Sequence, residues 1–175
     1  MDDKVIKSDR EDLGKVLGLV AEALIDRGIR IVTAESCTGG GIASAIVSIP
    51  GSSSWFESSY VAYSNDAKQR MLGVDPALFM PHRAGAVSQE VVKQMVVGAI
   101  EASGADIGLS VSGIAGPSGG TKDKPVGTVW IAWKHGANER SDCFFFSGGR
   151  DEVRDSAVIA ALAGVLDILN LCEVS

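Results

Sequence analysis

Apolar residues recur every three or four positions along much of the chain, which is the spacing of one face of an α-helix. The first such stretch contains Leu13, Val16, Leu17, Val20 and Leu24. It follows Ser8-Asp9-Arg10-Glu11, which has the form of a helix capping box, and it stops at Gly28, a residue typical of helix ends. The pattern therefore predicts a helix between the capping box and Gly28.

The same spacing predicts further helices over about residues 42–49, 66–72, 89–103 and 150–171. Ser64 or Asn65 is placed to cap the second of these helices, and Ser88 is placed to cap the third. Gly73 and Gly104 follow the last turns of the same two helices.

Short apolar runs lie between the predicted helices, and such runs are typical of buried strands. They cover residues 29–33, 60–63, 107–111, 126–133 and 141–146. No helix fits between the last two runs, so Gly136-Ala137-Asn138 is predicted to be the turn of an antiparallel hairpin. We therefore expect residues 1–175 to form one domain of the α/β class, a three-layer α/β/α sandwich with a mixed sheet of about five strands.

Composition and charge narrow the possible partners. The 175 residues carry a net charge of -6, which argues against binding of nucleic acid or of an acidic membrane through a basic face. The polar start Met1-Asp2-Asp3-Lys4 does not resemble a signal peptide, and no apolar run approaches the length of a membrane span. Cys37, Cys143 and Cys172 are too scattered to predict a disulfide framework or a zinc site. We expect a cytoplasmic protein without metal or cofactor.

The richest chemistry lies in the glycine turn of residues 34–41, between a predicted strand and a predicted helix. Such a turn points side chains and backbone N–H groups out of the carboxyl edge of a sheet. Ser36 is a candidate nucleophile there, and the alternative is that its hydroxyl caps the following helix. Cys37 is a rival nucleophile if the helix end favours its thiolate, and the alternative is a buried cysteine that acts as a small apolar side chain.

A serine nucleophile needs a base within hydrogen-bond reach. His82 lies in an irregular segment beside Arg83, and His135 lies near the predicted hairpin turn, so neither is well placed. Lys68 lies in the first turn of a predicted helix, where burial and the positive helix end would lower its pKa. Tyr63 ends the preceding strand. The alternatives are a solvated lysine and a tyrosine at the edge of the core.

A second glycine-rich loop, residues 112–121, follows the predicted strand 107–111. It lacks the terminal Gly-Lys-Ser/Thr of a phosphate-binding loop, but its glycines allow close backbone approach to an anion. A merely flexible loop is the alternative. Lys122, Lys124 and Arg150 are either sources of positive charge near it or ordinary surface residues.

Several of these segments resemble signatures of the CinA carboxyl-terminal domain family. They are residues 34–40, 63–68, 85–88, 112–120 and 124–129, in the order of the family, and the resemblance extends over about residues 10–170. One departure is Gly149, where many relatives have aspartate. Longer relatives carry an additional amino-terminal domain, and this chain resembles the stand-alone form.

The resemblance implies nicotinamide-nucleotide amidase activity, which converts nicotinamide mononucleotide to nicotinic acid mononucleotide and ammonia. It also implies the helix–sheet–helix fold, a homodimer, and a catalytic group of Ser36, Tyr63 and Lys68. The resulting hypothesis is that Lys68 takes the proton of Ser36 and that Tyr63 relays or positions it.

The remaining expected site residues bind the substrate. Backbone N–H groups of the first turn are expected to stabilise the oxyanion, at Thr38, Gly39 and Gly40. The phosphate is expected in the second loop, at Gly113, Ala115, Gly116, Gly120, Thr121 and Arg150. The alternative function is a non-catalytic nucleotide- or partner-binding protein of a competence or DNA-damage response.

Overall fold

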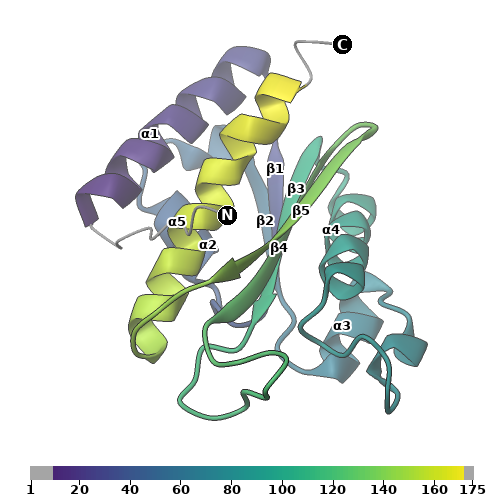
Figure 1. The fold of residues 1–175 in the computed structure, drawn as a ribbon. Coiled ribbons are helices and arrows are strands. Elements are labelled where there is room, and N and C mark those ends of the chain that lie inside the picture. The colour runs from purple at the N-terminus through teal and green to yellow at the C-terminus, as the bar shows by residue number, and fades with distance from the viewer. Residues whose placement is uncertain (1–9, 172–175) are drawn as a thin grey trace.

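A mixed sheet forms the centre of the molecule. The computed structural model describes residues 10–171 of the chain. Strands β1 (Ile31–Glu35), β2 (Phe56–Val61) and β3 (Ile107–Gly113) run parallel, whereas β4 (Thr128–His135) and β5 (Asn138–Phe145) form an antiparallel hairpin. The strand order is β2-β1-β3-β4-β5 (Figure 1). The predicted mixed sheet of five strands and the predicted hairpin are confirmed.

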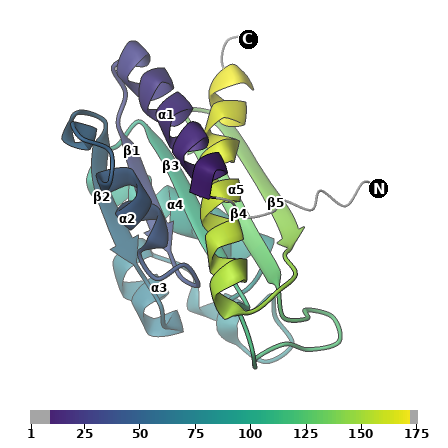
Figure 2. The same ribbon diagram turned by 90° about the vertical axis from the view of Figure 1, so that its left-hand side faces the viewer.

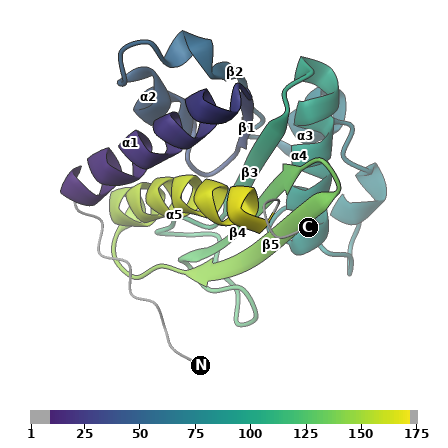
Figure 3. The same cartoon turned by 90° about the horizontal axis from the view of Figure 1, so that it is seen from above.

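Helices cover both faces of this sheet. One face carries α1 (Arg10–Arg27), α2 (Gly41–Val47) and α5 (Arg150–Leu171), which lie in front of the sheet in Figure 2. The other face carries α3 (Asn65–Leu72) and α4 (Gln89–Ser103), and the view from above separates the three layers (Figure 3). Short 3-10 turns, Ser52–Ser54 and Pro76–Phe79, complete the elements. The predicted three-layer arrangement is confirmed.

Clusters of buried apolar residues on both faces of the sheet hold the layers together. The larger core joins α1, α2 and α5 to the sheet and contains Trp55 and Trp133, both about 1% exposed. The smaller core lies beneath α3 and α4 and includes Val32 and Met95. The indole N–H of Trp133 donates to the carbonyl of Ala161 at 2.7 Å, so the buried ring is fully satisfied where β4 meets α5.

Local signals placed the helix ends well. The hydroxyl of Ser64 accepts the N–H of Ala67, and the hydroxyl of Ser88 accepts the N–H of Val91, so both serines cap their helices. Gly73 and Gly104 end the same helices in the left-handed conformation. The expected capping box begins at Ser8, which lies outside the described residues.

Strand boundaries differ from the prediction by two to four residues at the start of the sheet. The first strand is Ile31–Glu35 rather than 29–33, because the N–H of Ile29 still closes the end of α1 by donating to Leu24. Strand β2 begins at Phe56 rather than at residue 60. Its polar residues Ser58 and Ser59 pair with β1, and this edge strand therefore lacks the continuous apolar run on which the prediction depended.

The sheet topology gathers the glycine-rich segments at one edge. The parallel strands β1, β2 and β3 all end there, and α5 begins there. Strand β1 has β2 on one side and β3 on the other, so the connections from β1 diverge at this edge. Open α/β sheets bind ligands at such a point, and this edge is where the site is sought below.

Candidate active site

The turn after β1 is fixed by main-chain hydrogen bonds. The N–H of Ser36 donates to Val111 of β3 at 3.1 Å, and the carbonyl of Ser36 accepts the N–H of Gly39 at 3.0 Å. Gly40 has φ 92°, a left-handed conformation that favours glycine, and α2 starts directly after it. The alternative that the Ser36 hydroxyl caps this helix is wrong, because the N-cap position is Gly40 and the hydroxyl has another partner.

The side chain of Glu35 supplies the hydrogen-bond acceptor for the N–H groups at the N-terminus of α2. This side chain is 0% exposed and folds over the turn, where its carboxylate accepts the N–H groups of Gly40, Ile42 and Ala43 at 3.0, 3.0 and 2.8 Å. A carboxylate at a helix N-terminus satisfies N–H groups that have no partner within the helix and is favoured by the helix dipole. The N-terminus of α2 is therefore occupied by the protein's own anion.

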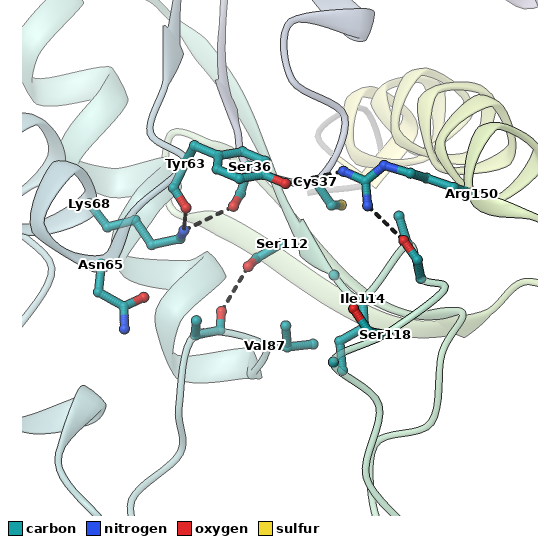
Figure 4. A pocket seen from close by; sticks show the side chains of 15 residues that line it. Ser36, Cys37, Tyr63, Asn65, Lys68, Val87, Ser112, Ile114, Ser118 and Arg150 are labelled. Atoms are coloured by element: carbon teal, nitrogen blue, oxygen red, sulfur yellow. Dashed lines mark hydrogen bonds between the residues drawn. The ribbon is translucent and has the colours of Figure 1, made fainter.

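Lys68 reaches the hydroxyl of Ser36 from the first helical turns of α3. Its Nζ lies 2.9 Å from Ser36 Oγ, 3.0 Å from the carbonyl of Ala62 and 3.3 Å from the carbonyl of Tyr63 (Figure 4). Lys68 is 1% exposed and Ser36 is 7% exposed, so both groups are nearly free of solvent. The expectation of a solvated lysine is wrong.

The surroundings of Lys68 favour the neutral amine. Burial lowers the pKa of Lys68 below 10.5, its ordinary value, and the nearby Cys37 sulfur opposes this effect. Carbonyl oxygens accept hydrogen bonds and do not donate them, so Ala62 and Tyr63 each take one N–H of the amine. The remaining tetrahedral position faces Ser36, and in the neutral amine this position holds the lone pair.

Tyr63 has two separate contacts. Its backbone carbonyl accepts from Lys68, whereas its phenol oxygen lies 3.1 Å from a guanidinium nitrogen of Arg150. No hydrogen bond joins the phenol to Ser36 or to Lys68 among the described residues. The expected proton relay through Tyr63 therefore has no contact to run through, because the side chain lies across the pocket toward α5 (Figure 4).

Cys37 is a poor nucleophile in this environment. Burial raises the pKa of its thiol to about 12, although backbone N–H groups of Cys37 and Thr38 and the charge of Lys68 oppose the rise. The side chain is 6% exposed and packs in the larger apolar core. The structure supports the interpretation of a buried cysteine that acts as a small apolar side chain over that of a rival thiolate nucleophile.

Ser36, Cys37, Tyr63 and Lys68 line a pocket of about 340 Å³ between the glycine turn and the second glycine-rich loop. Of the residues expected to bind substrate, Gly113, Ala115, Gly116 and Arg150 line it. Arg150 supplies positive charge to the lining, and no carboxylate is among the lining residues in the described part of the chain. The pocket therefore suits an anionic ligand even though the whole chain is acidic.

The other expected binding residues lie outside this lining. Gly39 donates its N–H to Ser36, and Gly40 donates to Glu35, so these two backbone groups are engaged within the protein. Thr38 is 0% exposed. Gly120 packs against Val126, and Thr121 forms a turn with Lys124 instead of facing the pocket. None of these five positions is among the residues that line the pocket.

Lys124 has a role that its charge alone did not predict. Its Nζ donates to the carbonyls of Ala84 and Val87 at 2.6 and 2.7 Å, and the hydroxyl of Ser112 donates to the carbonyl of Ala86 at 2.8 Å. These bonds tie the segment before α4 to the second loop and make it a wall of the pocket. Sequence reasoning assigned no residue of 84–87 to the site, because long-range contacts alone bring that segment there.

Further lining residues lie in the segments 63–68 and 112–121 that the sequence singled out, although none of them was predicted individually. They are Asn65, Ser112, Ile114, Ser118 and Gly119. Ser112 was recognisable in principle, because it ends a strand parallel to the one before Ser36. His82 and His135 are not among the lining residues. Within residues 10–171, no group of three or more His, Cys, Asp or Glu side chains is arranged to hold a metal ion, and no helix is long and apolar enough to span a membrane.

Gly149 precedes α5 at the N-cap position, where an aspartate side chain would cap the helix. In this chain the carboxylate of Glu152 accepts the N–H of Gly149 at 2.6 Å. This bond is one half of a capping box, in which the acid of the first turn accepts the N–H of the N-cap residue. The start of α5, which carries Arg150, is thereby held in place.

The family model of the CinA C-terminal domain matches residues 14–169. The chain is 57% identical over 139 residues to the nicotinamide-nucleotide amidohydrolase PncC of Pseudomonas putida, a match that covers 79% of this chain and 86% of the relative. It is 51% identical over 146 residues to the protein of that name from Escherichia coli strain K12, covering 82% of this chain and 86% of the relative.

Solved structures show the same fold. The competence/damage inducible protein CihA of Agrobacterium tumefaciens superimposes with a TM-score of 0.86 at 38% identity, covering 90% of this chain and 95% of that one. A CinA superfamily protein of Klebsiella pneumoniae superimposes with a TM-score of 0.86 at 36% identity, covering 91% of this chain and 98% of the other.

Proposed function

This chain belongs to the family of CinA C-terminal domains, and we propose that it is an amidohydrolase that converts nicotinamide mononucleotide to nicotinic acid mononucleotide and ammonia. The names of its close relatives supply the substrate. The observation that carries the chemistry is the 2.9 Å contact between Lys68 Nζ and Ser36 Oγ inside the pocket. A hydroxyl next to a buried amine of lowered pKa is the pairing that activates a serine nucleophile.

In the proposed reaction, neutral Lys68 takes the proton from Ser36 as Oγ attacks the carboxamide carbon. The new C–O bond forms, and the carbonyl electrons move to the oxygen. When the C–N bond breaks, Lys68 returns the proton to the leaving nitrogen, which departs as ammonia. The same amine then takes a proton from a water molecule as the water oxygen attacks the ester carbon. The bond to Ser36 Oγ breaks, Lys68 returns the proton to Oγ, and the released acid ionises to the carboxylate product.

Two backbone N–H groups are placed to stabilise the oxyanion. Among the described residues, the N–H groups of Cys37 and Thr38 donate to no oxygen. They directly follow the nucleophile in the chain, which is a position from which backbone N–H groups stabilise tetrahedral intermediates. Thr38 was also part of the sequence-based hypothesis. Cys37 takes the place of Gly39, because the N–H of Gly39 donates to the carbonyl of Ser36.

We place the phosphate of the substrate along the second loop, between Gly113 and Gly119, with Arg150 as its cation. Arg150 already contacts this loop, because one guanidinium nitrogen donates to the carbonyl of Gly116 at 2.7 Å. The phenol of Tyr63 lies beside the same guanidinium and borders the site. Backbone donors near one cation form a suitable phosphate site, and the N-terminus of α2 is already occupied by Glu35.

The test compares ammonia release from nicotinamide mononucleotide by the wild type and by Ser36→Ala, Lys68→Met and Cys37→Ala. Loss of the nucleophile or its base is expected to lower kcat by about 10³-fold or more, since the two act as one unit. Cys37→Ala is the matched control from the same turn and is expected to keep kcat within about threefold, because its thiol stays protonated.

Activity that survives in Ser36→Ala and disappears in Cys37→Ala would transfer the nucleophile to the thiol. If the folded wild type binds the nucleotide but releases no ammonia, the amidase proposal is wrong and a binding function takes its place. The family membership also leads us to propose a homodimer.

A further inference from the structure

We propose that Glu35 is a positioning residue, whose buried carboxylate holds the turn between β1 and α2 in the shape that presents Ser36 to Lys68. This inference rests on the proposed function, because it concerns the same nucleophile. Glu35 takes no part in the reaction steps above and is not among the residues that line the pocket.

The carboxylate of Glu35 is surrounded by donors. Oε2 accepts from the hydroxyl of Thr38 at 2.7 Å and from the N–H groups of Gly40 and Ile42 at 3.0 Å each. Oε1 accepts from the N–H of Ala43 at 2.8 Å, with the hydroxyls of Ser59 and Thr33 at 3.4 and 3.5 Å. No solvent reaches this side chain, which is 0% exposed, so these groups replace its hydration.

The two ends of Glu35 act on opposite ends of the turn. Its backbone is held within the sheet between Val61 of β2 and Val111 of β3. Its side chain reaches past the turn to the first residues of α2. Both ends of the turn formed by residues 36–40 are therefore fixed, one by the strand and the other by the first residues of α2. Fixing both ends determines the backbone conformation at Ser36.

Lys68 is held by a different segment, which is joined to β1 through the N–H of Ala62 and the backbone carbonyl of Glu35, a bond that a change of the Glu35 side chain leaves in place. The Lys68 amine is held by the carbonyls of Ala62 and Tyr63, which belong to the connection between β2 and α3. The Glu35 side chain makes no contact with this connection among the described residues, so the 2.9 Å contact joins an amine and a hydroxyl that different side-chain and backbone contacts position. A shift of the turn by about 1 Å would break the contact without moving the amine, and displacements of that size cost about 10²-fold in rate.

A carboxylate binds the N–H groups at the N-terminus of α2 better than any neutral side chain does. Both of its oxygens accept a backbone N–H, and a backbone N–H is unable to reverse its direction. In Glu35→Gln the amide oxygen keeps one set of donors, while the amide NH₂ faces the other. Glu35→Ala leaves the N–H groups of Gly40, Ile42 and Ala43 without their acceptor in a space that water does not reach in the wild type.

The experiment uses the full chain and the variants Glu35→Gln and Glu35→Ala. The matched control is Ser110→Ala, which removes an equally buried side chain that donates to Val92 on the opposite side of the sheet from the turn. For each protein we would measure kcat and KM for ammonia release, the thermal midpoint, and the rate at which a fluorophosphonate probe labels Ser36.

We expect Glu35→Ala to lower kcat and the labelling rate together by about 10²-fold, with KM changed by less than about threefold. Glu35→Gln is expected to retain more, with a loss of about tenfold. Ser110→Ala is expected to lower the thermal midpoint while keeping kcat and the labelling rate within about threefold. This separates positioning of the nucleophile from general loss of stability.

The inference is overturned if Glu35→Gln, folded by circular dichroism, keeps kcat and the labelling rate within about twofold of the wild type. It is also overturned if Ser110→Ala loses as much of both rates at an equal change in thermal midpoint. The probe requires no amide substrate. A wild type that is labelled but releases no ammonia would therefore refute the proposed substrate and leave the role of Glu35 to be decided by the labelling rates.

Discussion

At the scale of single residues, Lys68 is the side chain whose state decides what the site does. An ammonium group in this position would hold three oxygen partners and leave Ser36 without a base. Burial lowers the pKa of Lys68 and so increases the fraction of neutral amine near neutral pH. The expected consequence is measurable in both rate and stability.

The rate of amide hydrolysis should rise with pH through the lowered pKa of Lys68 and level off above it, since the neutral amine is the active form. The measurement is the pH profile of kcat/KM for ammonia release by the wild type. A profile that is flat below the ordinary lysine value of 10.5, or that falls as pH rises, would contradict a neutral lysine base.

The free energy of unfolding should also depend on pH through the lowered pKa of Lys68. Between the lowered pKa of Lys68 and 10.5, the unfolded chain binds a proton at this lysine that the folded chain does not, so the free energy of unfolding rises with pH over this window. Lys68→Met should lose that part of the slope in urea unfolding measured at several pH values. An unchanged slope in the variant would mean that Lys68 is charged when buried.

The contact of Lys68 with Ser36 was foreseen from the two strand-to-helix junctions together with the family resemblance. The partner of the Tyr63 phenol was not, because the direction of a partly exposed ring depends on packing rather than on its place in the sequence. The N–H groups of Gly39 and Gly40 were predicted to be free for the substrate, and this prediction failed for a related reason. A glycine turn predicts free N–H groups, but the buried carboxylate that binds one of them becomes visible only in three dimensions.

At the scale of elements, the packing of α3 against α4 depends on Gly98. A Cβ built at this position would lie 1.9 Å from the carbonyl oxygen of Leu72, and backbone is unable to move aside as a flexible side chain does. Helix propensity alone favours alanine over glycine by about 1 kcal/mol within a helix. Because the two helices approach so closely, we expect alanine at position 98 to destabilise the protein, whereas helix propensity alone predicts that it stabilises the helix.

Gly98→Ala should lower the free energy of unfolding by about 1–3 kcal/mol, the usual cost of overpacking. Gly18→Ala is the matched control, because Gly18 lies within α1 and its Cβ would meet nothing within 4 Å. That variant should be stabilised by up to about 1 kcal/mol. Both values come from urea unfolding, and a stabilised Gly98→Ala would show that α3 and α4 move apart freely.

At the scale of the whole molecule, charge is distributed unevenly. The chain carries a net charge of -6, yet no carboxylate is among the residues that line the pocket in the described part of the chain. The strand order places the ends of β1 and β3 side by side, and with them Ser36 and the second glycine-rich loop. An anionic substrate is therefore attracted locally, at one edge of a molecule that is acidic as a whole.

The proposed homodimer is also a property of the whole molecule. Light scattering of the purified protein should give a mass of about twice the 18.2 kDa of one chain, and the value should hold on dilution into the micromolar range. A particle of single-chain mass with full ammonia release would show that the site functions without a second copy.

The sequence by itself determined the order and type of the elements, the helix caps and the edge at which the active groups gather. These properties depend on local periodicity, on capping residues and on the rule that parallel strands end at the same edge. Tertiary structure alone decided which polar groups meet. Lys68 and Ser36 are 32 positions apart, Arg150 and Tyr63 are 87 apart, and Glu35 turns back onto its own helix. Such contacts follow from how buried groups satisfy one another, which spacing along a chain does not specify.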